Sequence, residues 1–78
     1  MLGEWMAKTR TDREVTGASL AAVLGVTRAA VSTWERGRSL PSAERLVSWG
    51  KALGVSAAVV NVGQELLRLE LEQQRRRP

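Results

Sequence analysis

Gly25 is the feature that most constrains how this chain can fold, because it separates two short amphipathic stretches. The first stretch ends at Leu24, and the second runs from Val26 to Trp34. Glycine tolerates a left-handed backbone, so it can end one helix and turn the chain sharply into the next. The pattern predicts two short helices that meet at a steep angle and touch near the turn.

The residues around the glycine meet the demands of such a turn. Ala21 is small, so the second helix can approach the first, and Thr27 is a favourable N-cap for the second helix. The apolar residues that can lock the pair onto a third element are Leu20, Val26, Val31 and Trp34. Together these features make about 17–36 a helix-turn-helix pattern, whose second helix keeps one side free for a DNA major groove.

Signals elsewhere predict helices on both sides of this pair. An apolar stripe predicts a first helix over about 2–13, and Thr16 can cap the helix that follows. The helix after the turn is expected over about 28–36, with Ala30 facing inward and Gly37 ending the helix. The pair is therefore expected to pack beside an N-terminal helix.

The C-terminal half predicts two more helices. Pro41 breaks the chain, Ser42 caps a fourth helix and Gly54 ends it. The apolar face of this fourth helix is expected to consist of Leu46, Val47, Trp49 and Leu53. A last helix is expected from Ala57 to about Gln74, opened by Ser56. We therefore expect an all-α fold of five helices.

Composition bounds the chemistry. A chain of 78 residues allows one small domain, here 1–78. It contains no cysteine and no histidine, which removes disulfides, thiolate ligands, and both the commonest general base and the commonest zinc ligand. Paired carboxylates on one buried face and a phosphate-cradling glycine loop are missing as well. We expect neither an enzyme nor a protein that holds a metal or cofactor.

The formal net charge is +4, from 12 basic and 8 acidic residues, which has the right sign for a nucleic-acid partner but is mild. Met1–Arg10 lacks the apolar segment of a signal peptide. No apolar stretch approaches the roughly 20 residues of a membrane span. A cytoplasmic location with no membrane partner is expected.

The residues of the central segment resemble the lambda-repressor-like (Cro/repressor, xenobiotic-response-element) helix-turn-helix family. The resemblance covers roughly Met6 to Val60. The motifs that carry it are Thr16, Leu20-Ala21, Leu24-Gly25-Val26-Thr27, Val31-Ser32, Trp34-Glu35-Arg36-Gly37, Pro41-Ser42 and Ala52-Leu53-Gly54-Val55-Ser56. It implies a compact five-helix bundle that usually binds double-stranded operator DNA as a dimer and regulates transcription.

The chain departs from the family pattern at Gly17. The family commonly has a glutamine after the capping threonine, and that side chain touches a DNA phosphate. Here only the backbone N–H groups at the start of the helix remain for the phosphate. We expect weaker non-specific affinity for DNA, without loss of function.

Base contacts are expected on the second helix of the pair. Arg28 opens this helix, and arginine can hold guanine O6 and N7 with two hydrogen bonds. Ser32 and Thr33 lie one turn later on the same face. The alternatives are a solvated arginine and a Ser32 hydroxyl that bonds back to its own helix. The predicted base-contacting residues are Arg28, Ala29, Ser32 and Thr33.

Phosphate contacts are expected at the edges of the pair. Arg36 and Arg38 flank Gly37 in a loop that would run along the DNA backbone. Thr16 and Ser42 begin helices whose N-termini can face a phosphate, although an ordinary capping role is the alternative. The predicted phosphate-contacting residues are Thr16, Gly17, Arg36, Arg38 and Ser42.

Other singled-out residues are expected to be structural. The resemblance implies that Glu35 pairs with Arg10 and ties the first helix to the third. Trp34 and Trp49 fall on apolar helix faces and belong in the core, whereas Trp5 is expected to be half exposed. Inside the fourth helix, Gly50 is expected to permit a close contact, against Trp34.

The last helix has an apolar stripe that requires a partner. The stripe consists of Val59, Val62, Leu66 and Leu69, which recur at alternating spacings of three and four residues. Leu67 and Leu71 form a second apolar edge. We expect 57–74 to be a dimerisation helix, kinked at Gly63, with 75–78 as a basic tail. The predicted homodimer interface is Val59, Val62, Leu66, Leu67 and Leu69. The alternative is that the stripe folds back onto its own domain.

These expectations favour a sequence-specific transcriptional regulator. A dimeric repressor or autoregulator would read an inverted-repeat operator, with half-sites about 34 Å apart. The alternative is an antitoxin or another protein-interaction module that uses the last helix to bind a partner protein.

Overall fold

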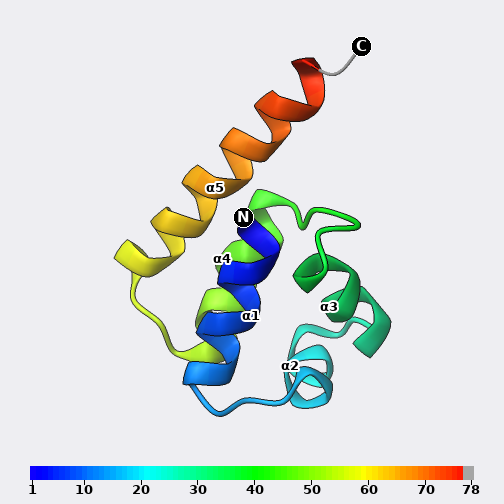
Figure 1. Ribbon diagram of the computed structural model, residues 1–78. Coiled ribbons are helices and arrows are strands. Elements are labelled where there is room, and N and C mark those ends of the chain that lie inside the picture. Colours follow the sequence, from blue (N-terminus) through cyan, green and yellow to red (C-terminus); the bar gives the residue numbers. More distant parts are fainter. Residues whose placement is uncertain (77–78) are drawn as a thin grey trace.

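The computed structural model describes residues 1–76, and within them every regular element is an α-helix (Figure 1). The predicted all-α class with five helices is confirmed. In chain order the helices are α1 (Leu2–Asp12), α2 (Gly17–Leu24), α3 (Arg28–Glu35), α4 (Ala43–Leu53) and α5 (Ala57–Arg76). Because α5 extends to Arg76, the start of the predicted basic tail is helical, whereas 77–78 lie outside the described residues.

The helix ends are where the local signals predicted them. Each predicted cap hydroxyl accepts a hydrogen bond from the backbone N–H three residues later, at 3.0–3.1 Å for the caps of α2, α3 and α4. These caps are Thr16, Thr27 and Ser42. Gly25 and Gly54 end α2 and α4 in the left-handed conformation, with φ of 69° and 70°. Local chemistry therefore determines the boundaries of the central helices.

The core lies where all five helices meet. Trp34 and Trp49 are buried as predicted, and Trp5 is half-buried with its ring centroid 5.2 Å from that of Trp49. The buried apolar residues are Leu2, Met6, Leu20, Ala21, Val31, Trp34, Leu46, Trp49, Leu53 and Leu67. The prediction for Val47 was wrong, because its side chain is 42% exposed. Leu46 and Leu53 face the core, and Val47 lies about 100° around the helix from Leu46.

Two glycines allow α5 to pack closely on the rest of the bundle. A Cβ at Gly50 would overlap the side chain of Val60, so the expected contact of this glycine with Trp34 was wrong. A Cβ at Gly63 would lie 2.7 Å from the ring of Trp5. Since α5 continues through Gly63 as one helix, this glycine provides room for the tryptophan rather than the expected kink.

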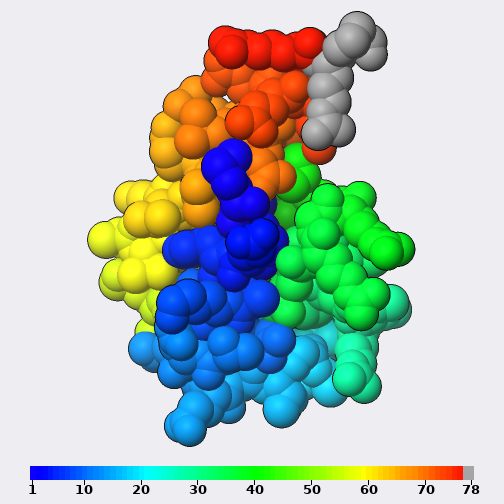
Figure 2. Space-filling view, viewed as in Figure 1, coloured from blue at the N-terminus to red at the C-terminus, as the bar shows by residue number. Residues whose placement is uncertain are grey.

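The second half of α5 stands away from the bundle, above the other four helices in Figures 1 and 2. Within residues 1–76, the last hydrogen bond from α5 to the bundle is at Glu70, whose carboxylate accepts from the backbone N–H of Leu2 at 2.7 Å. Leu67, one turn earlier, is in the core with 5% of its surface exposed. The protomer therefore anchors the first half of α5 and leaves most of the surface beyond Glu70 uncovered.

Candidate nucleic-acid interface

The α2–α3 turn has the geometry that the glycine predicted. After Gly25 turns the chain, the backbone N–H of Val26 donates back to the carbonyl of Ala21 at 3.0 Å. Ala21 is 3% exposed, and α2 and α3 pack directly on each other. The turn is therefore rigid, because its polar backbone groups are satisfied and its small residue is buried.

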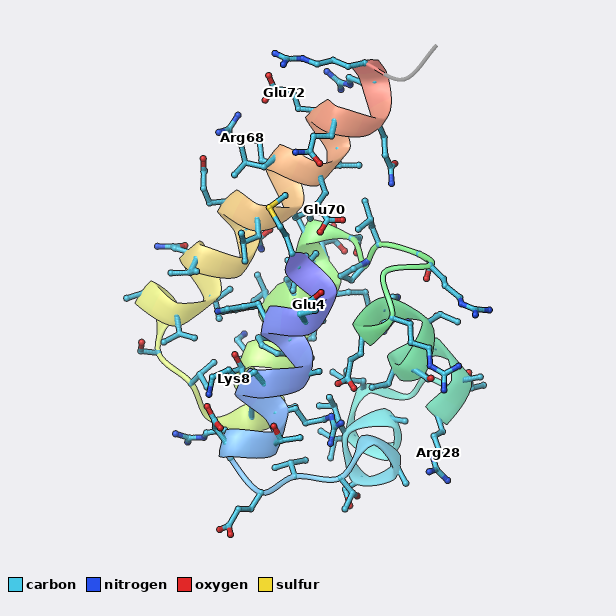
Figure 3. The ribbon with its side chains drawn as sticks, in the orientation of Figure 1. Glu4, Lys8, Arg28, Arg68, Glu70 and Glu72 are labelled. Carbon is cyan, nitrogen blue, oxygen red and sulfur yellow. The ribbon has the colours of Figure 1, made fainter. Side chains whose placement is uncertain are left out.

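This turn leaves one face of α3 open to solvent. Val31 and Trp34 point into the core, at 3% and 8% exposure. Arg28 and Ala29 are exposed, and Arg28 extends away from the body of the molecule in Figure 3. Ser32 lies on the same face, is partly buried and makes no side-chain hydrogen bond within residues 1–76.

Thr33 has a different environment from its neighbour Ser32. Its hydroxyl donates to the carbonyl of Ala30 at 2.8 Å and accepts from the hydroxyl of Ser39 at 3.1 Å. Its own carbonyl accepts from the backbone N–H of Arg38 at 2.9 Å. These bonds hold the loop after α3 in place, so the hydroxyl proton that a base contact would use is already donated within the protein.

An ion pair fixes α3 to α1. The Arg10 guanidinium donates to both carboxylate oxygens of Glu35, at 2.7 and 3.0 Å, and also to the carbonyl of Val15 at 2.8 Å. Both side chains are mostly buried, at 17% and 13% exposure. The hydrogen bonds to Glu35 raise the pKa of Arg10 above its ordinary value. The expected pairing is confirmed, and its geometry is the bidentate one that arginine favours.

Two further arginines cap helix C-termini, which the sequence analysis missed. Arg13 donates to the carbonyls of Leu53 and Gly54, both at 3.0 Å, at the end of α4. Arg45 donates to the carbonyl of Leu24 at 3.3 Å, at the end of α2. These contacts join residues 40 and 21 positions apart, so no local spacing could have indicated them.

The arginines of α3 and its following loop have no such partner. Within residues 1–76, Arg28, Arg36 and Arg38 make neither an ion pair nor a side-chain hydrogen bond. All three are exposed. Three unpaired positive charges therefore lie on or beside the open face of one helix, a surface that suits a polyanion.

A polar hollow of about 300 Å³ lies between α3 and the start of α2. The residues lining it are Arg10, Gly17, Arg28, Val31, Ser32, Glu35 and Arg36. Four of the predicted DNA-contacting residues, Gly17, Arg28, Ser32 and Arg36, thus come together around one concave surface. Ser42 does not line it and instead contributes to a separate hollow with Glu44 and Arg45 at the start of α4.

A family model described as helix-turn-helix matches residues 6–60. The chain belongs to the helix-turn-helix family. It is of the lambda-repressor-like type and is a DNA-binding transcriptional regulator rather than an enzyme. The match covers nearly the same segment as the resemblance seen in the sequence, Met6 to Val60.

One solved structure has the same fold as this helix-turn-helix protein. It is the crystal structure of the clp gene regulator ClgR from Corynebacterium glutamicum, whose sequence is 35% identical to this chain. The two structures align with a TM-score of 0.72. The alignment covers 94% of this chain and 79% of that one. No curated protein sequence matches the chain. Among the described residues, no helix has both the length and the apolar character needed to span a membrane.

The predicted dimer residues of this helix-turn-helix protein fall on two different faces of α5. Val60, Gly63 and Leu67 face α1 and α4. Leu67 is therefore part of its own protomer's core and has little surface left for a second chain. The other predicted interface residues form a neighbouring outer stripe, which is only partly covered: Val59, Val62, Leu66 and Leu69. Of these, Leu66 also packs against the core of its own protomer. Val62 is 50% exposed.

Proposed function

We propose that this helix-turn-helix protein is a dimeric repressor or autoregulator that reads an inverted-repeat operator through the major groove. The observation that carries the proposal is the set of unpartnered arginines on and beside the open face of α3: Arg28, Arg36 and Arg38. Each other described arginine of α1–α4 has a partner within the protein. The similarity to ClgR, a clp gene regulator, supports a role in gene regulation.

Arg28 is the residue we assign to base recognition. It opens α3 and extends outward, so its guanidinium can reach a guanine edge with two hydrogen bonds. Beside it, Ala29 offers a methyl group to thymine, and Ser32 has a free hydroxyl. We assign Thr33 the smaller role, because a base contact would replace its bond to Ala30.

Arg36 and Arg38 are the residues we assign to the DNA backbone. They follow the end of α3 and have no internal partner within residues 1–76, so they are free to contact phosphates. Thr16 and Ser42 hold the starts of α2 and α4 in place by capping, and any phosphate contact of theirs would be additional. Phosphate contacts of this kind place the protein on the duplex without selecting sequence.

The outer stripe of α5 is the surface we assign to dimerisation. Val62, which is exposed, and Leu69, which is partly buried, present apolar side chains on a face of α5 that its own bundle covers only in part. A single short α3 reads only a few base pairs, whereas two related by a two-fold axis read half-sites about 34 Å apart. Binding to an operator also supports the predicted cytoplasmic location, where such DNA would lie.

Selection of bound duplexes from a random oligonucleotide pool tests the proposed recognition. We expect an approximately inverted-repeat sequence with half-sites about one helical turn apart. An enriched sequence without two-fold symmetry would contradict the dimeric reading, and no enrichment would contradict sequence-specific binding.

Sedimentation of Val62→Asp/Leu69→Asp tests the interface. We expect monomers, because each aspartate would be buried without a partner at the two-fold axis. The control is Val23→Asp, which places a charge on an exposed α2 valine, 71% exposed and away from α5. A dimer that survives the double substitution would place the interface elsewhere.

A protein partner is the second candidate occupant of the α5 stripe. The exposed apolar residues Val62 and Leu71 would suit an antitoxin, in which α5 binds another protein. The same sedimentation experiment distinguishes a homodimer from a complex with another protein. A wild-type chain that is monomeric at concentrations where it retards DNA would favour a different protein as the partner of α5.

A further inference from the structure

An apolar hollow of about 320 Å³ lies where α4 turns into α5. Four of the six residues that line it are apolar, whereas the hollow in front of α3 contains three arginines and a glutamate. We call this surface the α4–α5 groove. Its residues come from α4, from the loop and from the first turns of α5: Val47, Lys51, Val55, Ala57, Val60 and Asn61.

Val47 distinguishes the groove from ordinary packing space. It fits the apolar stripe of α4 in the sequence, yet its side chain is 42% exposed. A single exposed valine is normal on a protein surface. Here, however, the same hollow is lined by Val55 and Val60, which the bundle covers only in part. Contiguous apolar surface in a concavity is typical of a site that another molecule covers.

Lys51 adds one positive charge to the groove. Within residues 1–76 its ammonium makes neither an ion pair nor a side-chain hydrogen bond. The positions three and four residues away on either side hold no acidic residue, so α4 offers it no carboxylate. The amide of Asn61, on α5, also makes no side-chain hydrogen bond within the described residues. The groove therefore combines an apolar lining with two exposed, free hydrogen-bond donors.

The groove lies on the opposite side of the bundle from α3. In Figure 1 the loop between α4 and α5 is at the lower left and α3 is on the right, with α1 and α4 between them. Figure 2 shows the same separation at the surface. None of the residues of the outer stripe of α5 lines the groove. A molecule bound there would use neither the open face of α3 nor that stripe.

We propose that the α4–α5 groove docks a short segment of another protein, in which a large apolar side chain lies next to an aspartate or a glutamate. The apolar side chain packs against Val47, Val55 and Val60, and the carboxylate accepts hydrogen bonds from Lys51 and Asn61. Ligand pockets span about 300–1,000 Å³, so a groove near the lower limit suits one or two side chains. A peptide also gains contacts beyond the groove, which a small molecule of that size lacks.

A second copy of the chain suits the groove less well than another protein. The chain has an apolar and acidic segment of its own at 69–72, beyond the core contact of Leu67. Both carboxylates of that segment are already engaged, Glu70 with the backbone of Leu2 and Glu72 with two arginines of α5. The free donors of the groove therefore require a carboxylate from elsewhere.

Selection from a random peptide library displayed on phage, with the full chain as the target, tests the proposal. We expect enriched peptides to share a large apolar residue beside an aspartate or glutamate. In fluorescence anisotropy with a labelled enriched peptide, Val47→Asp should lower affinity by at least about 10-fold, because the complex buries an unpaired charge. Val23→Asp, at a valine of α2 that is 71% exposed, is the matched control and should bind like the wild type. No enrichment, or enrichment of peptides without an acidic residue, would overturn the proposal.

A charge exchange tests the role of Lys51. Lys51→Glu should lower affinity for the enriched peptide by about 10-fold, since it places like charges together. The same peptide with lysine in place of its acidic residue should bind Lys51→Glu more tightly than it binds the wild type. Arg75→Glu, an equal reversal at an exposed residue outside the groove, should change neither affinity. Equal binding to the wild type and Lys51→Glu would overturn the stated partner chemistry.

Three further measurements identify the occupant. In NMR titrations of the labelled protein, the peptide should shift the amides of the groove and leave that of Val62 unchanged, and the reverse pattern would overturn the location. In sedimentation, Val47→Asp should associate like the wild type, and a loss of association would make a second copy the occupant. Octanoate, a small apolar acid, should not displace the peptide, and displacement would make the groove a small-molecule site.

Discussion

The arginines on and beside α3 are chemically identical to Arg68 and Arg76 of α5 but differ from them in their partners. On α5, Arg68 pairs with Glu65 and Glu72, and Arg76 pairs with Glu72 at 3.1 Å. On α3 and the following loop, Arg28, Arg36 and Arg38 have no partner within residues 1–76. The net charge of +4 conceals this difference, because only the unpaired charges are available to DNA.

Helical spacing explains the difference. On α5 a carboxylate lies three or four residues from Arg68 in both directions, which is the distance at which helix side chains meet. Around Arg28 and Arg36 the same positions hold only apolar residues, glycine, serine or threonine. The chain therefore keeps acidic residues within reach of the α5 arginines and away from those of α3.

The largest expected effect comes from removing Arg10, which is paired with Glu35 of α3. Arg10→Met should destabilise the protein by about 3 kcal/mol, because Glu35 would stay mostly buried without its partner. For a domain of this size, that lowers the melting temperature by roughly 12–24 °C, as circular dichroism would measure.

A paired substitution controls for lost packing in this experiment. Arg10→Met combined with Glu35→Leu removes the stranded charge and should recover most of the stability. A single Arg10→Met variant that melts like the wild type would show that the ion pair does not hold α3 in place. The partnered arginine would then have no structural role that distinguishes it from the unpaired arginines.

The next largest effect tests the free arginines. Arg28→Ala should lower affinity for the selected duplex by about 5- to 150-fold, since a bidentate contact to a base contributes about 1–3 kcal/mol. The melting temperature should not change measurably, because Arg28 has no partner within residues 1–76 to lose. Gel retardation and a thermal melt measure the two quantities.

Arg68→Ala is the matched control, since it removes the same charge from α5. If both variants lose affinity equally, the effect is one of net charge, and the distinction between the two helices has no meaning for DNA. Loss of affinity without loss of selectivity in Arg28→Ala would reject the base contact alone.

A smaller, sequence-independent effect is expected at Arg38. Arg38→Ala should weaken binding to the selected and unrelated duplexes by the same factor, and the salt slope should fall in magnitude by about 0.9. Anisotropy titrations at several salt concentrations measure both. A loss on the selected duplex alone would move Arg38 from the backbone contacts to base recognition.

Much of the fold was predictable because its signals are local. Thr16, Thr27 and Ser42 cap helices through residues three positions away, and Gly25 turns the chain by its own backbone. The open face of α3 follows from the helical repeat of its residues, once Val31 and Trp34 are assigned to the core. The pairing of Arg10 with Glu35 came from the family resemblance, not from spacing.

The remaining features depend on contacts between distant segments. On α5 two apolar stripes lie side by side, and periodicity alone could not say which one faces the bundle. The choice depends on Gly63 receiving Trp5 and on Gly50 receiving Val60, contacts between segments distant in the chain. The bond of Thr33 to Ser39 was equally hidden, because it depends on the path of a loop.

The smallest expected effect lies in the exposed pairs of α5. The Arg68 guanidinium hydrogen-bonds Glu65 and lowers the pKa of that carboxyl below its ordinary value of 4.5. A lowered pKa adds stability above pH 4.5 and loses it as the pH falls through the lowered value. Glu65→Gln should therefore melt slightly below the wild type at pH 7, and the gap should narrow as the pH falls below 4.5 through the lowered pKa. Glu14→Gln, at a residue without an ion pair within 1–76, should show no such closing gap. A difference in melting temperature that persists in acid would mean that Glu65 acts through packing. The ion pair with Arg68 would then contribute nothing to stability.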